Sequence, residues 1–213
     1  MGISKNGLHG ETTGKVGNLV YYYRLGKLIV RTIGKTTKPP TIKQLQCRQQ
    51  LSVASAVFSD MLGFINVSYS MRIIGTDSSA YNEAMKYNKK NATAGVYPHV
   101  QMVYDKVLVS EGELVQAVDP TVTVSAEGLV FSWDTDPQMP WPEYTDQVMM
   151  MAYFPELREC RYVLFGATRQ MGTDTLLLDE ELQGAYMETY ISFISGNRKQ
   201  VATSQYTGSL NAV

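Results

Sequence analysis

Few residues of this chain have the types and spacing that could support catalysis. The only thiols are Cys47 and Cys160, and the only histidines are His9 and His99. An imidazole within hydrogen-bond reach can activate a thiol as a nucleophile, so Cys47 with His99 is the single candidate pair. Four such scattered residues do not form the clustered ligand set of a tetrahedral zinc site. The sequence therefore predicts no catalytic residues, no metal site and no cofactor.

A glycine–lysine run near the N-terminus matches the phosphate-binding loop only in part. Residues His9 to Val16 read HGETTGKV. A phosphate-binding loop has four residues between its glycines and a Ser or Thr directly after Gly-Lys. Here three residues separate Gly10 from Gly14, and Val16 stands where the hydroxyl is needed. We therefore interpret this run as the lead-in to a β-hairpin.

A basic and aromatic stretch is the strongest candidate for a contact surface. Residues 24–48 contain seven Lys and Arg and no Asp or Glu, and three tyrosines come directly before them. Charge interleaved with aromatic rings suits a surface that contacts another molecule. The residues predicted to form this surface are Tyr21, Tyr23, Arg24, Lys27, Arg31 and Lys35.

Several interpretations of this stretch remain open. The cations suit phosphates and the rings suit stacked bases, as in single-stranded nucleic acid binding. The same residues suit a protein partner or self-association. A purely structural role would also account for these residues, because Lys and Arg protect exposed strand edges from aggregation and Tyr favours strands regardless of function. The total charge of −1 disfavours a dedicated nucleic-acid binder, so we predict a protein or self-association surface first.

The total charge conceals a reversal of sign along the chain. Residues 1–106 carry 14 Lys and Arg against 5 Asp and Glu, a net of +9, and residues 107–213 carry 5 against 15, a net of −10. This reversal predicts two domains, a basic one over 1–105 and an acidic one over 106–213. It also allows the two halves to attract one another, within the chain or between copies.

The basic half is expected to contain a β-hairpin followed by two helices. Two β-favouring runs, 16–23 and 28–33, flank Gly26, which can adopt the positive φ of a tight turn. Pro39-Pro40 then ends extended structure, and Thr41 with Gln44 has the pattern of a capping box. The first helix is predicted over 42–69, with a possible bend at Gly63, and the second over 78–92. The predicted buried face of the first helix is Leu51, Ala54, Phe58, Met61, Leu62, Ile65 and Tyr69.

The acidic half is expected to be all-β. A strand over 99–109 begins it, and seven short strands separated by turn residues follow, which is typical of an antiparallel sandwich. We predict that Trp133 points inward with Phe131 and Leu129 and anchors two sheets. The seven predicted strands are 121–125, 128–133, 146–154, 161–167, 174–178, 185–194 and 199–206.

Two resemblances extend this interpretation. The runs LVFSWD at 129–134 and AYMETYISFISGNRKQVATSQY at 185–206 resemble a fibronectin type III or immunoglobulin-like sandwich, which implies that fold for about 113–210. The whole chain resembles an uncharacterised bacterial family of unknown function, which implies no activity. Its GKxG…R…K…PxT…Q…R arrangement is also similar to small prophage-encoded proteins. The matching residues are Gly14-Lys15-Val16-Gly17-Asn18, Arg31, Lys35, Pro39-Pro40-Thr41, Gln44, Arg48, Tyr97-Pro98 and Lys106-Val107-Leu108.

The expected function is therefore a non-enzymatic interaction or assembly protein of α+β class. Nucleic-acid binding through the basic hairpin is the alternative, and an unrecognised enzyme comes last. The sequence contains no run of 18 apolar residues, so it predicts no membrane span. The polar N-terminus lacks the apolar core of a secretory signal, so we expect a cytoplasmic or particle-associated protein.

Overall fold

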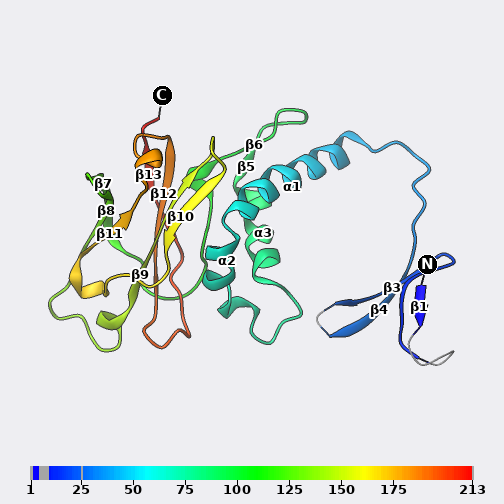
Figure 1. Cartoon of the computed structure of the whole chain (residues 1–213), viewed down its shortest axis with the longest axis horizontal. Helices are drawn as coiled ribbons and strands as arrows, with labels where there is room; N and C mark the ends of the chain where they lie inside the picture. Colours follow the sequence, from blue (N-terminus) through cyan, green and yellow to red (C-terminus); the bar gives the residue numbers. More distant parts are fainter. Residues whose placement is uncertain (1, 5–9, 25, 213) are drawn as a thin grey trace. The chain divides into compact units, whose positions relative to one another are not determined.

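The computed structural model describes residues 2–4, 10–24 and 26–212, and His9 lies outside these ranges. The chain is mixed α+β (Figure 1) and divides into two compact units, Met1–Thr41 and Ile42–Val213. The domain boundary near residue 105 rests on the charge reversal and stays a prediction, whereas compact packing divides the chain between Thr41 and Ile42.

The first unit is an antiparallel sheet with strand order β1-β2-β3-β4. The predicted hairpin is its β3–β4 pair, and Gly26 takes the expected positive φ, 77°, in the turn between them. The strands β1 and β2 were not predicted. The four strands are β1 (Gly2–Ser4), β2 (Thr12–Val16), β3 (Leu19–Arg24) and β4 (Lys27–Thr32).

The second unit begins with a helical layer. Three α-helices form it, α1 (Ile42–Asp60), α2 (Leu62–Ser68) and α3 (Ala80–Asn91), followed by the short pair β5 (Thr93–Ala94) and β6 (Gln101–Met102). Single 3-10 turns occur at η2 (Met71–Ile73), η3 (Tyr104–Lys106), η4 (Glu143–Thr145), η5 (Arg169–Met171) and η6 (Glu180–Leu182). Ser79 caps α3, since its hydroxyl accepts a hydrogen bond from Asn82 N at 3.2 Å.

Seven strands follow and form two antiparallel sheets with orders β11-β8-β7 and β10-β9-β12-β13. Six of the seven overlap their predicted ranges for most of their length. The last was predicted over 199–206 and shares only Gln205 and Tyr206 with the observed strand, because residues 195–204 form a longer connection. The strands are β7 (Val118–Val124), β8 (Gly128–Asp134), β9 (Gln147–Phe154), β10 (Glu159–Val163), β11 (Thr173–Leu177), β12 (Met187–Ile194) and β13 (Gln205–Leu210).

The four-stranded sheet lies between two cores, because alternate residues of a strand point to opposite faces. In β9, Met150 and Ala152 pack toward the three-stranded sheet, whereas Met149 and Met151 pack toward the helices. Figure 1 shows this order, with the helices on one side of the four-stranded sheet and β7, β8 and β11 on the other. As predicted, Trp133 is buried between the sheets. Its ring meets the Phe193 ring edge-on, with 5.4 Å between the ring centroids.

The predicted first helix is in fact two helices that meet at Met61 at an angle of 88°. Leu51 and Leu62, both predicted to be buried, are exposed. Leu62 lies directly after the bend, and Leu51 lies in the first part of α1, where no residue before Ala54 is buried. Gly63 allows the second helix to approach β10, since a Cβ there would lie 2.1 Å from the Tyr162 Oη atom. Within the described residues no single helix is long and apolar enough to cross a membrane, and α1 with α2 meets that test only as this bent pair.

The predicted strand over 99–109 is mostly wrong. Only Gln101–Met102 forms a strand, and the 3-10 turn of Tyr104–Lys106 follows it. The alternating apolar residues there serve packing, since Val107 and Val109 are buried in the helical core. Hydrogen bonds from Asn88 of α3 satisfy the backbone of Leu108, so this segment has no need of a neighbouring strand.

Candidate interaction surfaces

The register of the first unit separates the predicted surface into two faces. Residues directly opposite each other in an antiparallel pair share a face. Tyr21 lies opposite Val30 and Tyr23 lies opposite Leu28, which places them on one face, the tyrosine face. The other face, the basic face, carries Arg24 and Lys27, which lie opposite each other. It also carries Arg31 and Lys15, which lie on either side of Val20 on the neighbouring strands.

The structure therefore does not bring together all the residues predicted for this surface. Tyr21 and Tyr23 point away from the basic face, and Lys35 lies beyond the end of β4. The ring that does accompany the cations is that of Tyr22, and the Arg31 guanidinium lies 5.8 Å from its centroid, a cation–π contact. Counting by twos along β3 would have assigned Tyr22 to this face from the sequence.

The tyrosine face ends at an acidic residue. The pKa of the exposed Tyr23 is raised. The main cause is the hydrogen bond between its hydroxyl and the Glu11 carboxylate, and desolvation is a smaller one. Glu11 is the only acid among residues 1–41, against seven Lys and Arg. The first unit thus has a net charge of +6, and the second, with 12 Lys and Arg against 19 Asp and Glu, has −7.

The side chains of this sheet are not covered. Among its described residues, none in the first 41 positions is buried. Large apolar side chains at Val16, Tyr23, Leu28 and Val30 are 40–49% exposed. A sheet of this size that has no buried residue of its own gains little hydrophobic stabilisation.

The candidate catalytic pair receives no geometric support. Cys47 is exposed on α1, and its Sγ atom accepts a hydrogen bond from Lys89 Nζ at 3.0 Å, whereas the exposed His99 makes no such contact with it in the described part of the chain. The other thiol, Cys160, is half-buried, and desolvation raises its pKa to about 12. Neither cysteine is placed as an activated nucleophile.

A buried arginine, Arg169, connects several loops at one end of the second unit. This end, the loop end, is formed by residues 110–117, 135–146, 164–172 and 195–204. The Arg169 guanidinium donates to the carbonyl oxygens of Val115 and Gln116, at 2.6 and 3.1 Å, and lies 3.4 Å from the Asp146 carboxylate. It also stacks on the Phe193 ring at 3.8 Å. Burial raises the pKa of Asp146 and lowers that of Arg169, while their attraction opposes both shifts.

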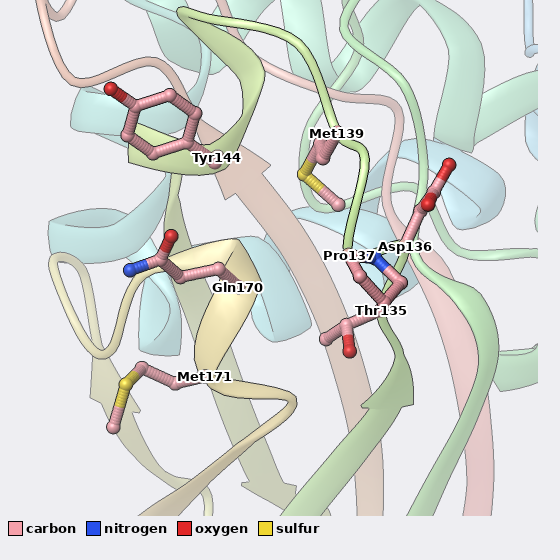
Figure 2. Close-up of a pocket in the computed structure, with 7 residues that line it drawn as sticks. All are labelled: Thr135, Asp136, Pro137, Met139, Tyr144, Gln170 and Met171. Atoms are coloured by element: carbon pink, nitrogen blue, oxygen red, sulfur yellow. The ribbon is translucent and has the colours of Figure 1, made fainter.

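One cavity at the loop end, of about 450 Å³, does not have the geometry of a binding site. Its lining residues come from the loop after β8 and from η5. Figure 2 shows the Tyr144 hydroxyl and the Gln170 amide pointing away from the Asp136 carboxylate, so the polar groups do not converge. The Asp136 carboxylate is already used locally, since it accepts a hydrogen bond from Gln138 N at 2.8 Å.

A second opening at the loop end, the Trp141 groove, combines apolar walls with carboxylates. It has a volume of about 340 Å³, and 74% of the Trp141 side chain is exposed. Its lining contains Glu113, Glu143 and Asp146, and no Lys or Arg. The full lining is Glu113, Leu114, Val115, Trp141, Pro142, Glu143, Thr145, Asp146, Ser195, Gly196, Asn197 and Gln200.

Comparison with known proteins assigns the family. Residues 11–208 match the model of a family of unknown function (DUF6266). The chain belongs to this family. No curated protein and no solved structure matches it. Membership confirms the predicted resemblance to a family of unknown function and assigns no activity.

The loop end of this DUF6266 protein was not found from the sequence. Arg169 and Asp146 are 23 residues apart in sequence, and only the folded loops bring them together. Trp141 carried a usable signal, because a tryptophan in a Pro-rich polar connection is rarely placed there for core packing.

Proposed function

We propose that this chain is a non-enzymatic interaction and assembly protein that binds a protein partner or a second copy through the sheet of its first unit. The observation that carries this proposal is that no described residue of the first 41 positions is buried, although the sheet exposes Val16, Tyr23, Leu28 and Val30. Uncovered apolar side chains in contiguous strands are characteristic of a contact surface. A partner that covers the tyrosine face supplies the burial that the sheet lacks.

The separation of charge and rings supports a protein partner over nucleic acid. Single-stranded nucleic acid is bound where cations track the backbone and rings stack on the bases in one groove. Here Tyr21 and Tyr23 lie on the face opposite Arg24 and Arg31, and Tyr22, the β3 tyrosine on the basic face, already has the Arg31 guanidinium over its ring. An apolar face with a basic reverse side suits a protein interface, where aromatic residues form the centre and charges form the rim.

The second unit supports the proposal as a scaffold. The orders β7-β8-β11 and β10-β9-β12-β13, joined by the buried Trp133, suit a fibronectin type III-like sandwich. Such a fold presents its end loops for contacts, although a fold alone assigns no function. A mobile-element setting and a cytoplasmic or particle-associated location stay predictions from the sequence.

The test is the mass of the full chain in solution and the capture of partners. We expect a concentration-dependent mass by light scattering, or a recovered protein partner, and loss of either on Val30→Asp at the tyrosine face. The control Thr13→Asp places the same charge on the opposite face, where Thr13 lies opposite Ile3. Circular dichroism confirms that both variants keep their strands.

Two results would contradict this proposal. One is a monomer at every concentration with no recovered partner. The other is tight binding to single-stranded DNA or RNA that falls steeply with salt and is lost when Arg24, Lys27 and Arg31 become Ala, which would establish the nucleic-acid alternative.

A further inference from the structure

We infer that the Trp141 groove binds the basic segment Arg31–Lys38 of a second copy of this chain, with a Lys or Arg side chain of that segment lying against the Trp141 indole. This inference rests on the proposed self-association and names the site on the other copy. The groove lies in the second unit and the segment in the first, so each copy carries both halves of the contact.

The groove has the shape and chemistry for a cation on an apolar stem. Trp141, Val115 and Leu114 supply apolar walls, and an indole face attracts a guanidinium or ammonium group. Glu113 and Glu143 supply negative charge, and neither pairs with a cation in the described part of the chain. The side chain of Arg or Lys offers this combination, since its stem packs on apolar surface while its head stays charged.

The groove is held open before anything binds. On one side Thr145 Oγ1 donates to the Pro142 carbonyl oxygen at 2.6 Å. On the other side Ser195 Oγ accepts from Gln200 N at 2.9 Å and donates to Asn197 Oδ1 at 2.8 Å. Beneath them, Arg169 already pairs with Asp146, the third carboxylate of the lining. Little ordering is therefore required on binding, which favours affinity.

Charge complementarity identifies the occupant. Residues 31–38 read RTIGKTTK, with three cations and no acid. Arg31 and Thr32 are the last residues of β4, residues 33–38 follow it, and all eight are exposed. The first unit has a net charge of +6 and the second −7, so contact between the first unit of one copy and the second unit of another is attractive, whereas like units repel one another.

This contact joins two different surfaces, so it is heterologous. A heterologous contact repeats from copy to copy and gives a ring where the rotation closes and an open filament where it does not. We therefore expect association beyond the dimer as concentration rises, and weaker association at high salt, because exposed charges are screened.

The experiment is sedimentation velocity of the full chain over a concentration series, with tryptophan fluorescence on the same samples. We expect Trp141→Ala and Glu143→Lys each to weaken association by about tenfold or more, as for a central interface residue. Two matched controls, Leu177→Ala and Glu127→Lys, change an exposed apolar and an acidic residue at the opposite end of β8 and β11. They should associate like the wild type.

A charge swap tests direct contact between copies. The triple variant Arg31→Glu, Lys35→Glu, Lys38→Glu should not self-associate, nor should Glu143→Lys, but a mixture of the two should form a complex. The emission of Trp141, the exposed one of the two tryptophans, should shift to shorter wavelength on association and not in Trp141→Ala.

The outcomes distinguish this inference from the function on which it rests. If the wild type associates, Val30→Asp abolishes association, and Trp141→Ala and Glu143→Lys have no effect, the groove assignment is overturned and the assembly function stands. If the wild type is monomeric at all concentrations but captures a protein partner, this inference alone is overturned. If it is monomeric and no protein partner is recovered, both are overturned.

Discussion

Replacing Arg169 by Ala tests whether one buried guanidinium holds the loop end together. The variant loses hydrogen bonds to the carbonyl oxygens of Val115 and Gln116, the stacking on Phe193, and the partner of Asp146. Charged hydrogen bonds contribute about 1.5–3 kcal/mol each, but removal of the arginine also removes its own desolvation penalty. Measured losses for breaking a buried pair are about 3–5 kcal/mol, and we expect a loss of unfolding free energy in that range.

The cause of the loss has a pH signature. Burial raises the pKa of Asp146, and the Arg169 charge opposes that shift, so the pKa rises further in the variant. A carboxyl group whose folded pKa lies above its unfolded value binds more protons in the folded state, and its unfolding free energy falls as pH rises between the two. The deficit of Arg169→Ala should therefore be smallest near pH 4, close to the unfolded pKa of about 3.9, and grow toward pH 7.

Urea denaturation of the wild type and the variant at pH 4 and pH 7 measures this directly. The control is Arg161→Ala, whose guanidinium pairs with Glu159 and Asp179 at the surface and should cost about 0.2–1 kcal/mol. Adding Asp146→Asn to Arg169→Ala should recover stability at pH 7, because the unpaired carboxylate is gone. A loss below about 1 kcal/mol at pH 7, or a loss independent of pH that Asp146→Asn does not reduce, would refute the reasoning.

Two further predictions concern the helical layer. Gly63→Ala should lower the unfolding free energy because the new Cβ would meet Tyr162 Oη at 2.1 Å, and Tyr162→Phe should reduce that loss in urea denaturation; equal losses in both backgrounds would show that this contact is not the cause. Asn88→Ala should cost about 1–3 kcal/mol because the part-buried N–H of Leu108 loses its acceptor, while the Leu108 carbonyl keeps the Tyr69 hydroxyl as a donor. Asn91→Ala on the exposed side of the same helix should cost about 0.5 kcal/mol or less, and similar losses for the two variants would show that the Asn88–Leu108 hydrogen bonds are not the cause.

Local signals predicted much of the fold. Gly26 predicted the β3–β4 turn, and alternation predicted β8 with Trp133 inward, because both features depend on residues that are close in sequence. Apolar periodicity alone predicted one continuous helix, since the residues on either side of Met61 repeat as in one helix. Gly63 predicted a bend, and the break lies two residues before it. The strand expected over 99–109 failed because Asn88 satisfies the backbone of Leu108 from another element.

The candidate surfaces were predicted less completely, because they depend on which side chains share a face. The cations were identified from composition, but the register of β3 and β4 separates Tyr21 and Tyr23 from Arg24 and Arg31. Strand register depends on pairing, which composition does not contain. The buried pair Arg169–Asp146 depends on tertiary contacts between loops, so neither residue stands out in the sequence.

The layers of the second unit restrict where it can contact another molecule. The helices cover the outer face of the four-stranded sheet, since Met149, Met151 and Tyr153 are buried against them. The outer face of the three-stranded sheet carries a row of hydroxyls, in which Thr121 and Thr173 flank Ser132, and a polar row offers little apolar area to a partner. The loop end differs from both, because it places the exposed Trp141 beside carboxylates. The exposed aromatic residue beside carboxylates on one unit and the exposed cations of residues 31–38 on the other are complementary in charge and chemistry, and the proposed assembly between copies would use both.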